Sequence, residues 1–175
     1  KMFDRISHRY DFLNHVLSVG QDLIWRRRVL HHLSPTMDHQ QGLDLATGTG
    51  DMLFTLLGDR RVDHVVGLDL SEGMLAQAQL KSEKRGLAGK AQFQVGDATR
   101  IPLESGGFDL VTMAFGIRNV LDVSACLREI VRVLKPGGRA VILELSLPRW
   151  PLARALYRFY FRHLLPRLVS AISGD

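Results

Sequence analysis

A buried strand, a glycine turn and a helix follow one another in residues 42–57, and this stretch constrains the fold most. Residues 42–46 are apolar apart from Asp44, and the turn from Thr47 to Gly50 carries two glycines. Glycine allows a positive φ and leaves no side chain in the way of a ligand, while the start of the next helix offers unpaired N–H groups. The pattern is typical of a nucleotide-binding turn, with Asp51 expected to cap the helix rather than to act as a catalyst.

Strands and helices alternate along the chain at the lengths of parallel crossover connections. We expect further strands at 64–70, 91–95, 108–115 and 139–145, helices at 72–85 and 123–134, and a turn at 135–138. Most strands are apolar on both faces, which is typical of a parallel sheet covered by helices on both sides. The predicted fold is therefore α/β and Rossmann-like, with a ligand lying across the carboxyl ends of the strands.

Two flanking segments complete a single predicted domain of 175 residues. Apolar spacing predicts helices within 1–36, which would form a lid over a ligand-binding core at 37–150. The second of these helices carries an apolar stripe of Leu23, Ile24, Val29, Leu30 and Leu33. A last helix is expected at 151–175. Since no transmembrane run or signal peptide is predicted, we expect a cytoplasmic protein.

Charge and cysteine content limit the classes of function. The formal net charge is +5, and arginines cluster at 26–28 and 149–167, which suits either acidic partners or a solvated surface. The single cysteine, Cys126, lies in an apolar helical pattern and is expected to be a buried core residue rather than a nucleophile. A lone cysteine also fits a reducing compartment. No metal site is expected.

Three local features bear on which nucleotide the sheet binds. The dinucleotide fingerprint G-x-G-x-x-G is incomplete, because its third glycine position, counted from Gly48, holds Leu53. Asp69 ends the second strand, where a carboxylate accepts from ribose hydroxyls in either kind of ligand. Asp97 and Ala98 follow the third strand, where the carboxylate suits an exocyclic adenine amine. This second acid favours a single adenosine lying across three strands.

These residues are similar to the motifs of a known class of enzymes. Asp44 to Gly50, Asp69 and residues 96–98 resemble the donor motifs of class I S-adenosylmethionine-dependent methyltransferases. Narrower motifs resemble the ubiquinone/menaquinone biosynthesis C-methyltransferases, and these lie at residues 2–20, 114–120, 132–138 and 172–175. The resemblance covers essentially the whole chain in the family's order.

The resemblance implies S-adenosylmethionine as the cofactor and methylation of a ring carbon of a polyprenylated quinol, giving menaquinone or the matching ubiquinone intermediate. The donor-binding residues that we expect are Asp44, Thr47, Gly48, Thr49, Gly50, Asp69, Met74, Asp97, Ala98 and Ala114. Ala114 stands where family members often have serine, which leaves only a backbone contact there. The family's usual last two strands have no counterpart before Asp175, so we expect an incomplete domain.

Catalysis on a quinol requires loss of a hydroxyl proton, in-line placement of the ring and exclusion of water. Arg118 is the candidate beside the ring oxygen, where its cation would lower the hydroxyl pKa; the alternative is an ion pair with an acid such as Asp122. Asn119 would orient a ring hydroxyl or cap the helix that begins near Asp122. Tyr10 and His8 are lid candidates for the proton path, although a surface histidine is an ordinary alternative.

Several readings of partners and function stay open at this stage. Aromatic residues and arginines in the tail suit peripheral contact with the inner face of a membrane, while packing or a homodimer contact explains the same pattern. No nucleic-acid partner is expected. The alternative functions are methylation of another small acceptor, nucleotide-dependent oxidation or reduction, and a non-catalytic donor-binding scaffold. Leu53 argues against the oxidoreductase, and the intact donor motifs argue against the scaffold.

Overall fold

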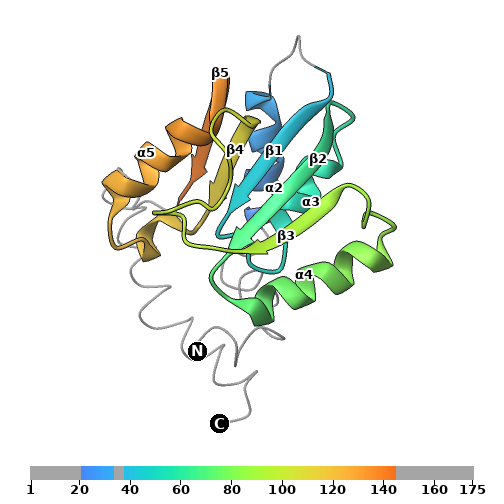
Figure 1. Cartoon of the computed structure of the whole chain (residues 1–175). Coiled ribbons are helices and arrows are strands. Elements are labelled where there is room, and N and C mark those ends of the chain that lie inside the picture. The colour runs from blue at the N-terminus through green and yellow to red at the C-terminus, as the bar shows by residue number, and fades with distance from the viewer. Residues whose placement is uncertain (1–20, 34–37, 145–175) are drawn as a thin grey trace, which may run out of the picture. The chain divides into compact units, whose positions relative to one another are not determined.

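A parallel sheet forms the centre of the computed structural model, which describes residues 21–33 and 38–144 (Figure 1). Its five strands are β1 (Gln40–Leu45), β2 (Val62–Asp69), β3 (Ala91–Val95), β4 (Phe108–Ala114) and β5 (Leu134–Leu143). All neighbours pair in parallel, in the order β3-β2-β1-β4-β5. The five carboxyl ends therefore share one edge, and the strand order reverses between β1 and β4, where open α/β sheets bind ligands.

Helices cover both faces of this sheet, as predicted. They are α2 (Gln21–Val29), α3 (Asp51–Leu57), α4 (Glu72–Lys84) and α5 (Val123–Val133), with short 3₁₀ turns η1 (Leu30–His32) and η2 (Ile117–Asn119). The helices α2 and α3 share one apolar core on one face, and α5 forms a second core on the other (Figure 1). Cys126 of α5 is fully buried in that second core, and burial raises the pKa of its thiol, so the expected core role is confirmed.

The predicted turn at 135–138 is wrong, because β5 already begins at Leu134. The register with β4 jumps from the pair Phe108–Leu134 to the pair Leu110–Arg139, so residues 135–138 stand opposite a single residue of β4. Gly137 has a φ of +81° within this bulge. The proline and the two glycines at 136–138 therefore form a bulge inside the strand, and they do not mark its start.

The helix α2 turns a partly charged side towards the protein. The predicted apolar stripe is wrong for Leu23 and Ile24, which are 51% and 55% exposed. Asp22 and Arg26 are buried instead, on the same side as Val29. Spacing of four residues brings Asp22 and Arg26 onto one face of the helix, where opposite charges attract each other.

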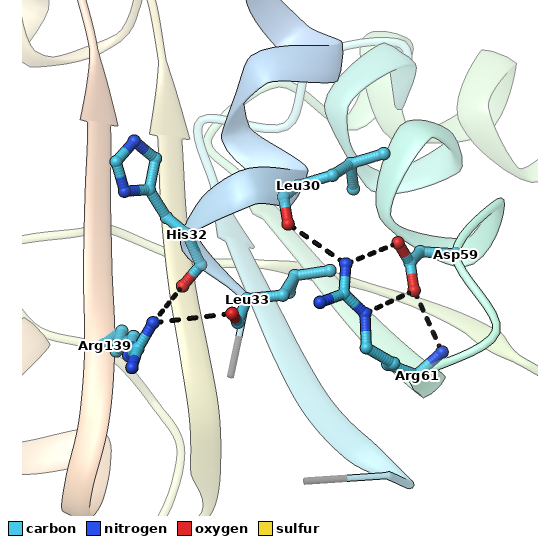
Figure 2. Close-up of polar contacts among 6 residues, drawn as sticks. All are labelled: Leu30, His32, Leu33, Asp59, Arg61 and Arg139. Carbon is cyan, nitrogen blue, oxygen red and sulfur yellow. Dashed lines mark hydrogen bonds and ion pairs between the residues drawn. The ribbon is translucent and has the colours of Figure 1, made fainter. Parts of the chain in front are cut away.

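Two arginines fasten the end of this helical segment to the core (Figure 2). Arg61 donates to the carbonyl oxygen of Leu30 at 3.1 Å, and Asp59 holds the guanidinium of Arg61 through two hydrogen bonds of 2.8 Å. Arg139 donates to the carbonyl oxygens of residues 32 and 33 at 3.0 and 3.4 Å. The carbonyl of Leu30 also accepts from the backbone N–H of Leu33, so the two arginines add to the capping of this helix end, and they fix which side of the segment faces the sheet.

Some predictions concern residues that the structure does not describe. Tyr10 and His8 of the expected lid lie outside the described residues, and so does the tail helix at 151–175. Among residues 21–33 and 38–144, no helix is long and apolar enough to cross a membrane.

Candidate functional site

The glycine turn lies at the carboxyl end of β1, beside the point where the strand order reverses. Gly48 has a φ of +56°, and a Cβ built on it would meet no atom of residues 21–33 or 38–144 within 4 Å. Gly50 has a φ of +90°, and a Cβ there would lie 2.7 Å from the ring of Phe54. Gly50 is the N-cap of α3, so the prediction that Asp51 caps the helix is wrong. The turn therefore leaves open space at Gly48 and packs tightly at Gly50.

Asp69 ends β2 and is fixed against the same turn. Its Oδ2 accepts from the backbone N–H of Gly48 at 2.8 Å, and its Oδ1 accepts from that of Ser71 at 2.9 Å. Ser71 in turn caps α4 by accepting from the backbone N–H of Met74, whose side chain is buried. Each oxygen of Asp69 keeps a further lone pair. The structure thus brings Gly48 and Asp69 together, and it buries the side chain of Met74 in the first turn of α4.

The acid after β3 lies next to the end of β2. Gly96 donates from its backbone N–H to the carbonyl oxygen of Asp69 at 3.0 Å, which sets Asp97 directly after that contact. Asp97 is exposed, and its Oδ1 accepts from the N–H and the hydroxyl of Thr99, both at 2.8 Å. Ala98 is half-buried against the core under α5. Asp69 and Asp97 therefore follow neighbouring strands at one edge.

Asp44 lies beneath the turn in a buried network. Its side chain is 1% exposed, and its two oxygens accept from the hydroxyls of Thr47 and Thr112, each at 2.7 Å. Burial raises the pKa of Asp44 from 3.8 to about 6, although both hydroxyls and the charge of Arg26 act in the opposite direction. Asp44 therefore links β1, the turn and β4. Because its pKa is about 6, its carboxyl group changes between the neutral and the ionised form just below neutral pH.

A charged cluster beside the turn was not predicted as a site. Arg26 of α2 is only 8% exposed, and its guanidinium lies 3.7 Å from Asp22 and 3.8 Å from Asp51. The ammonium of Lys81 lies 3.5 Å from Asp51 and donates to the hydroxyl of Thr49 at 2.9 Å. Arg27 and Arg28 are exposed, so only the first arginine of the run is buried. The four-residue spacing of Asp22 and Arg26 was the signal for this cluster.

The segment after β4 forms the other side of the edge. Ala114 ends the strand, and Phe115 follows with a φ of +59°, which strains a residue that is not glycine. The Cζ atom of Arg26 lies 5.5 Å from the centre of the Phe115 ring, a cation–π distance. Such strain is concentrated at functional sites, and here it occurs where the sheet reverses its order.

Arg118 and Asn119 lie in the turn η2, on the same loop. Arg118 is 51% exposed and pairs with Glu144 at 3.4 Å rather than with Asp122. Asp122 is instead the N-cap of α5, where it accepts from the backbone N–H of Ala125 at 2.8 Å. The alternative in which Asn119 caps that helix is therefore wrong, and its side chain is exposed. Glu144 was not predicted as a partner, because it directly follows β5 and is 26 residues away from Arg118 in the sequence.

A parallel sheet in this order, with a glycine turn after β1 and acids after β2 and β3, defines the Rossmann-like class of nucleotide-binding domains. The ubiE/COQ5 methyltransferase family matches over residues 1–175. The chain belongs to this family, and it is a methyltransferase.

Individual relatives are similar over nearly the whole chain. A demethylmenaquinone methyltransferase of Thermus thermophilus is 45% identical over 174 residues, which cover 99% of this chain and 78% of the relative. A ubiquinone/menaquinone biosynthesis C-methyltransferase UbiE of Geotalea daltonii is 44% identical over 167 residues, 95% of this chain and 71% of the relative.

Solved structures are similar in fold. A Methanococcus maripaludis protein assigned as an S-adenosyl-L-methionine-dependent methyltransferase has a TM-score of 0.74 at 20% identity, covering 98% of this chain and 77% of its own. Phosphoethanolamine N-methyltransferase 2 of Haemonchus contortus, solved with S-adenosyl-L-methionine, has a TM-score of 0.64 at 26% identity. That match covers 78% of this chain and 31% of the other. The predicted class I methyltransferase fold is thereby confirmed.

Proposed function

We propose that this chain transfers a methyl group from S-adenosylmethionine to a ring carbon of a polyprenylated quinol. The observation that best supports S-adenosylmethionine as the donor is the open space at Gly48, next to the carboxylate of Asp69, which accepts from the backbone N–H of Gly48. The acceptor is supported by the names of the relatives from Thermus thermophilus and Geotalea daltonii. Because a polyprenyl chain resides in a bilayer, we also propose that the enzyme works at a membrane surface.

The described residues fit the adenosine part of this donor. Asp69 would accept from the ribose hydroxyls with the lone pairs that its two backbone bonds leave over. The hydrogen bonds from Thr99 both fall on Oδ1 of Asp97, so Oδ2 is the oxygen that would receive an adenine amine. The backbone at Gly48, Thr49 and Gly50 would border the ligand.

Other predicted donor residues would act from behind the binding surface. The hydroxyl of Thr47 is committed to Asp44, and Met74 is a buried residue in the first turn of α4, so we assign these three residues to positioning the turn and the start of that helix. Ala98 and Ala114 would line the edge through small side chains. The fit is therefore carried by a short row of polar groups held by the ends of β1, β2 and β3.

When bound, the donor would supply its sulfonium methyl group to a nucleophilic ring carbon and remain as S-adenosylhomocysteine, and the hydrogen of that ring carbon would leave as a proton to water. The guanidinium of Arg118 would stabilise the oxyanion of the acceptor ring and so lower the pKa of its hydroxyl. Its pairing with Glu144 holds the guanidinium at the end of β4 while leaving half of the side chain exposed to a ligand. Asn119, exposed next to it, would orient a ring hydroxyl.

A methylation assay tests this function on the full chain in detergent. Methyl-labelled S-adenosylmethionine is offered with demethylmenaquinol or with 2-methoxy-6-polyprenyl-1,4-benzoquinol, and label in the quinol product is measured. We expect label in at least one product, and no binding of NAD by calorimetry. Binding of the donor without label in either quinol would contradict the acceptor and favour a different acceptor or a scaffold.

Arg118→Ala should lower turnover on the accepted quinol by at least about 10-fold while leaving donor affinity within about 2-fold of wild type, because Arg118 lies on the acceptor side of the edge. Turnover is measured in the same assay and donor affinity by calorimetry. Arg128→Ala, which removes an exposed arginine from α5, is the matched control and should change neither quantity. Equal turnover in Arg118→Ala and wild type would remove Arg118 from the mechanism.

A further inference from the structure

We propose that Arg26 binds the α-carboxylate of the donor's amino-acid tail, an inference that rests on the proposed use of S-adenosylmethionine. The guanidinium of Arg26 is more than nine-tenths buried, yet its Nε has no hydrogen-bond partner in the described part of the chain. Its nearest carboxylates, on Asp22 and Asp51, lie at 3.7 and 3.8 Å, beyond hydrogen-bonding distance. A buried donor group without a partner is costly, which indicates that a ligand completes it.

The place of Arg26 along the edge matches the position of such a tail. The acids proposed for the adenosine follow β3 and β2, and the open glycine follows β1. A ligand that continues along the edge in the same direction reaches the gap between β1 and β4. Arg26 lies in that direction, since it contacts both Asp51 after the turn and the Phe115 ring after β4.

The fold holds Arg26 at this place from two sides. Arg61 and Arg139 fasten the end of the helical segment to the sheet and so fix which residues of α2 face the edge (Figure 2). The strained Phe115 places its ring 5.5 Å from the guanidinium, which restricts the side chain without using any of its N–H groups. Arg26 is therefore preorganised, and its Nε–H is the donor that no group in the described part of the chain accepts.

The charges around Arg26 suit an amino acid better than a phosphate. Arg26 and Lys81 bring two cationic groups against the carboxyls of Asp22 and Asp51, and the charge of Arg26 also acts on Asp44, so the cluster has no excess of positive charge. An amino-acid tail brings one carboxylate and one ammonium and leaves this balance unchanged. A pyrophosphate would add negative charge next to two carboxylates, which is unfavourable in a partly buried site.

Calorimetric titration with two donors tests the assignment on the full chain. The probes are S-adenosylmethionine and decarboxylated S-adenosylmethionine, which keeps the sulfonium and the ammonium and lacks only the carboxylate. Wild type should bind the first about 10- to 100-fold more tightly, the effect of a charge-assisted hydrogen bond. Arg26→Gln should lose this preference by weakening only the binding of S-adenosylmethionine.

Two further variants control for charge and for folding. Arg27→Gln removes the exposed neighbouring cation and should keep the full preference of wild type. Arg26→Lys keeps the buried charge with a different set of donors, and it should bind S-adenosylmethionine with an intermediate affinity and the decarboxylated donor as wild type does. If Arg26→Gln does not fold, this lysine variant decides the question.

The outcomes separate the two proposals. Equal weakening of both donors in Arg26→Gln, or a wild-type preference retained in it, would overturn the assignment of Arg26 while leaving the methyl donor in place. A wild-type chain that binds neither donor would contradict the proposed function itself.

Discussion

Replacing Gly50 with alanine should cost about 3 kcal/mol of folding free energy, whereas the same change at Gly48 should cost only about 1 kcal/mol. Both glycines have a positive φ, which an alanine adopts only with strain. They differ in what a new Cβ would meet, because the ring of Phe54 lies 2.7 Å from it at Gly50, whereas no atom in the described part of the chain lies within 4 Å of it at Gly48. Chemical denaturation of the two variants and wild type measures the difference.

For the affinity of S-adenosylmethionine the order should be reversed, so that Gly48→Ala loses more than Gly50→Ala. A methyl group at Gly48 enters the open space where we place the donor, so Gly48→Ala should weaken S-adenosylmethionine binding by at least about 10-fold in a folded protein. Gly50→Ala, measured under conditions where it is folded, should bind more tightly than Gly48→Ala. Equal losses of stability in the two variants would show that backbone strain alone, rather than contact with Phe54, makes Gly50 necessary.

The sequence was sufficient to predict all five strands, though not the start of β5, because each strand contains apolar residues and is separated from the next by helix or turn signals. The helices that follow the first two strands begin at the predicted residues, 51 and 72, since a helix start depends on neighbours in the chain. The errors share a physical cause, which is that the partner of a side chain comes from elsewhere. The sequence left Arg26 open between an acidic partner and a solvated surface, and only the folded chain brings Asp51 and Phe115 beside it.

The partners of the site residues show the same limit. Asp69 was predicted as a ribose ligand from its distance to the turn, and the structure adds the backbone bond that holds it there. The alternative role for Arg118 was an ion pair with Asp122, four residues away. That acid caps α5 instead, and Arg118 pairs with Glu144, which follows the neighbouring strand β5. Periodicity and motif spacing describe local order, whereas charge pairing between strand ends depends on the assembled sheet.

Asp44→Asn should make the protein more stable than wild type at pH 7 and change nothing at pH 3 to 4. Because burial raises the pKa of Asp44 from 3.8 to about 6, the folded chain binds a proton more tightly than the unfolded chain does. The stability of wild type is therefore complete below pH 4 and falls as the pH rises through about 6. The loss is about 3 kcal/mol.

The measurement is the difference in unfolding free energy between Asp44→Asn and wild type at each pH, which cancels the titration of groups that both share. An amide at position 44 still pairs with the hydroxyls of Thr47 and Thr112, so this difference should grow between pH 4 and 7 and then stay constant. Asp59→Asn is the control: Arg61 lowers the pKa of Asp59 to about 2, so its difference from wild type should be flat above pH 4. A flat difference for Asp44→Asn as well would mean that its carboxylate is not strained by burial.

Ligand binding should respond to the same proton in the opposite sense. The donor carries a positive sulfonium, and an ionised Asp44 beneath the turn attracts it, so affinity for S-adenosylmethionine should rise as the pH passes through about 6. The neutral thioether of S-adenosylhomocysteine should show less of this rise, and Asp44→Asn should show none with either ligand. Stability and donor affinity would then change in opposite directions over one range of pH. Burial of this carboxylate, unfavourable for the free protein, would be what prepares the site for a cation.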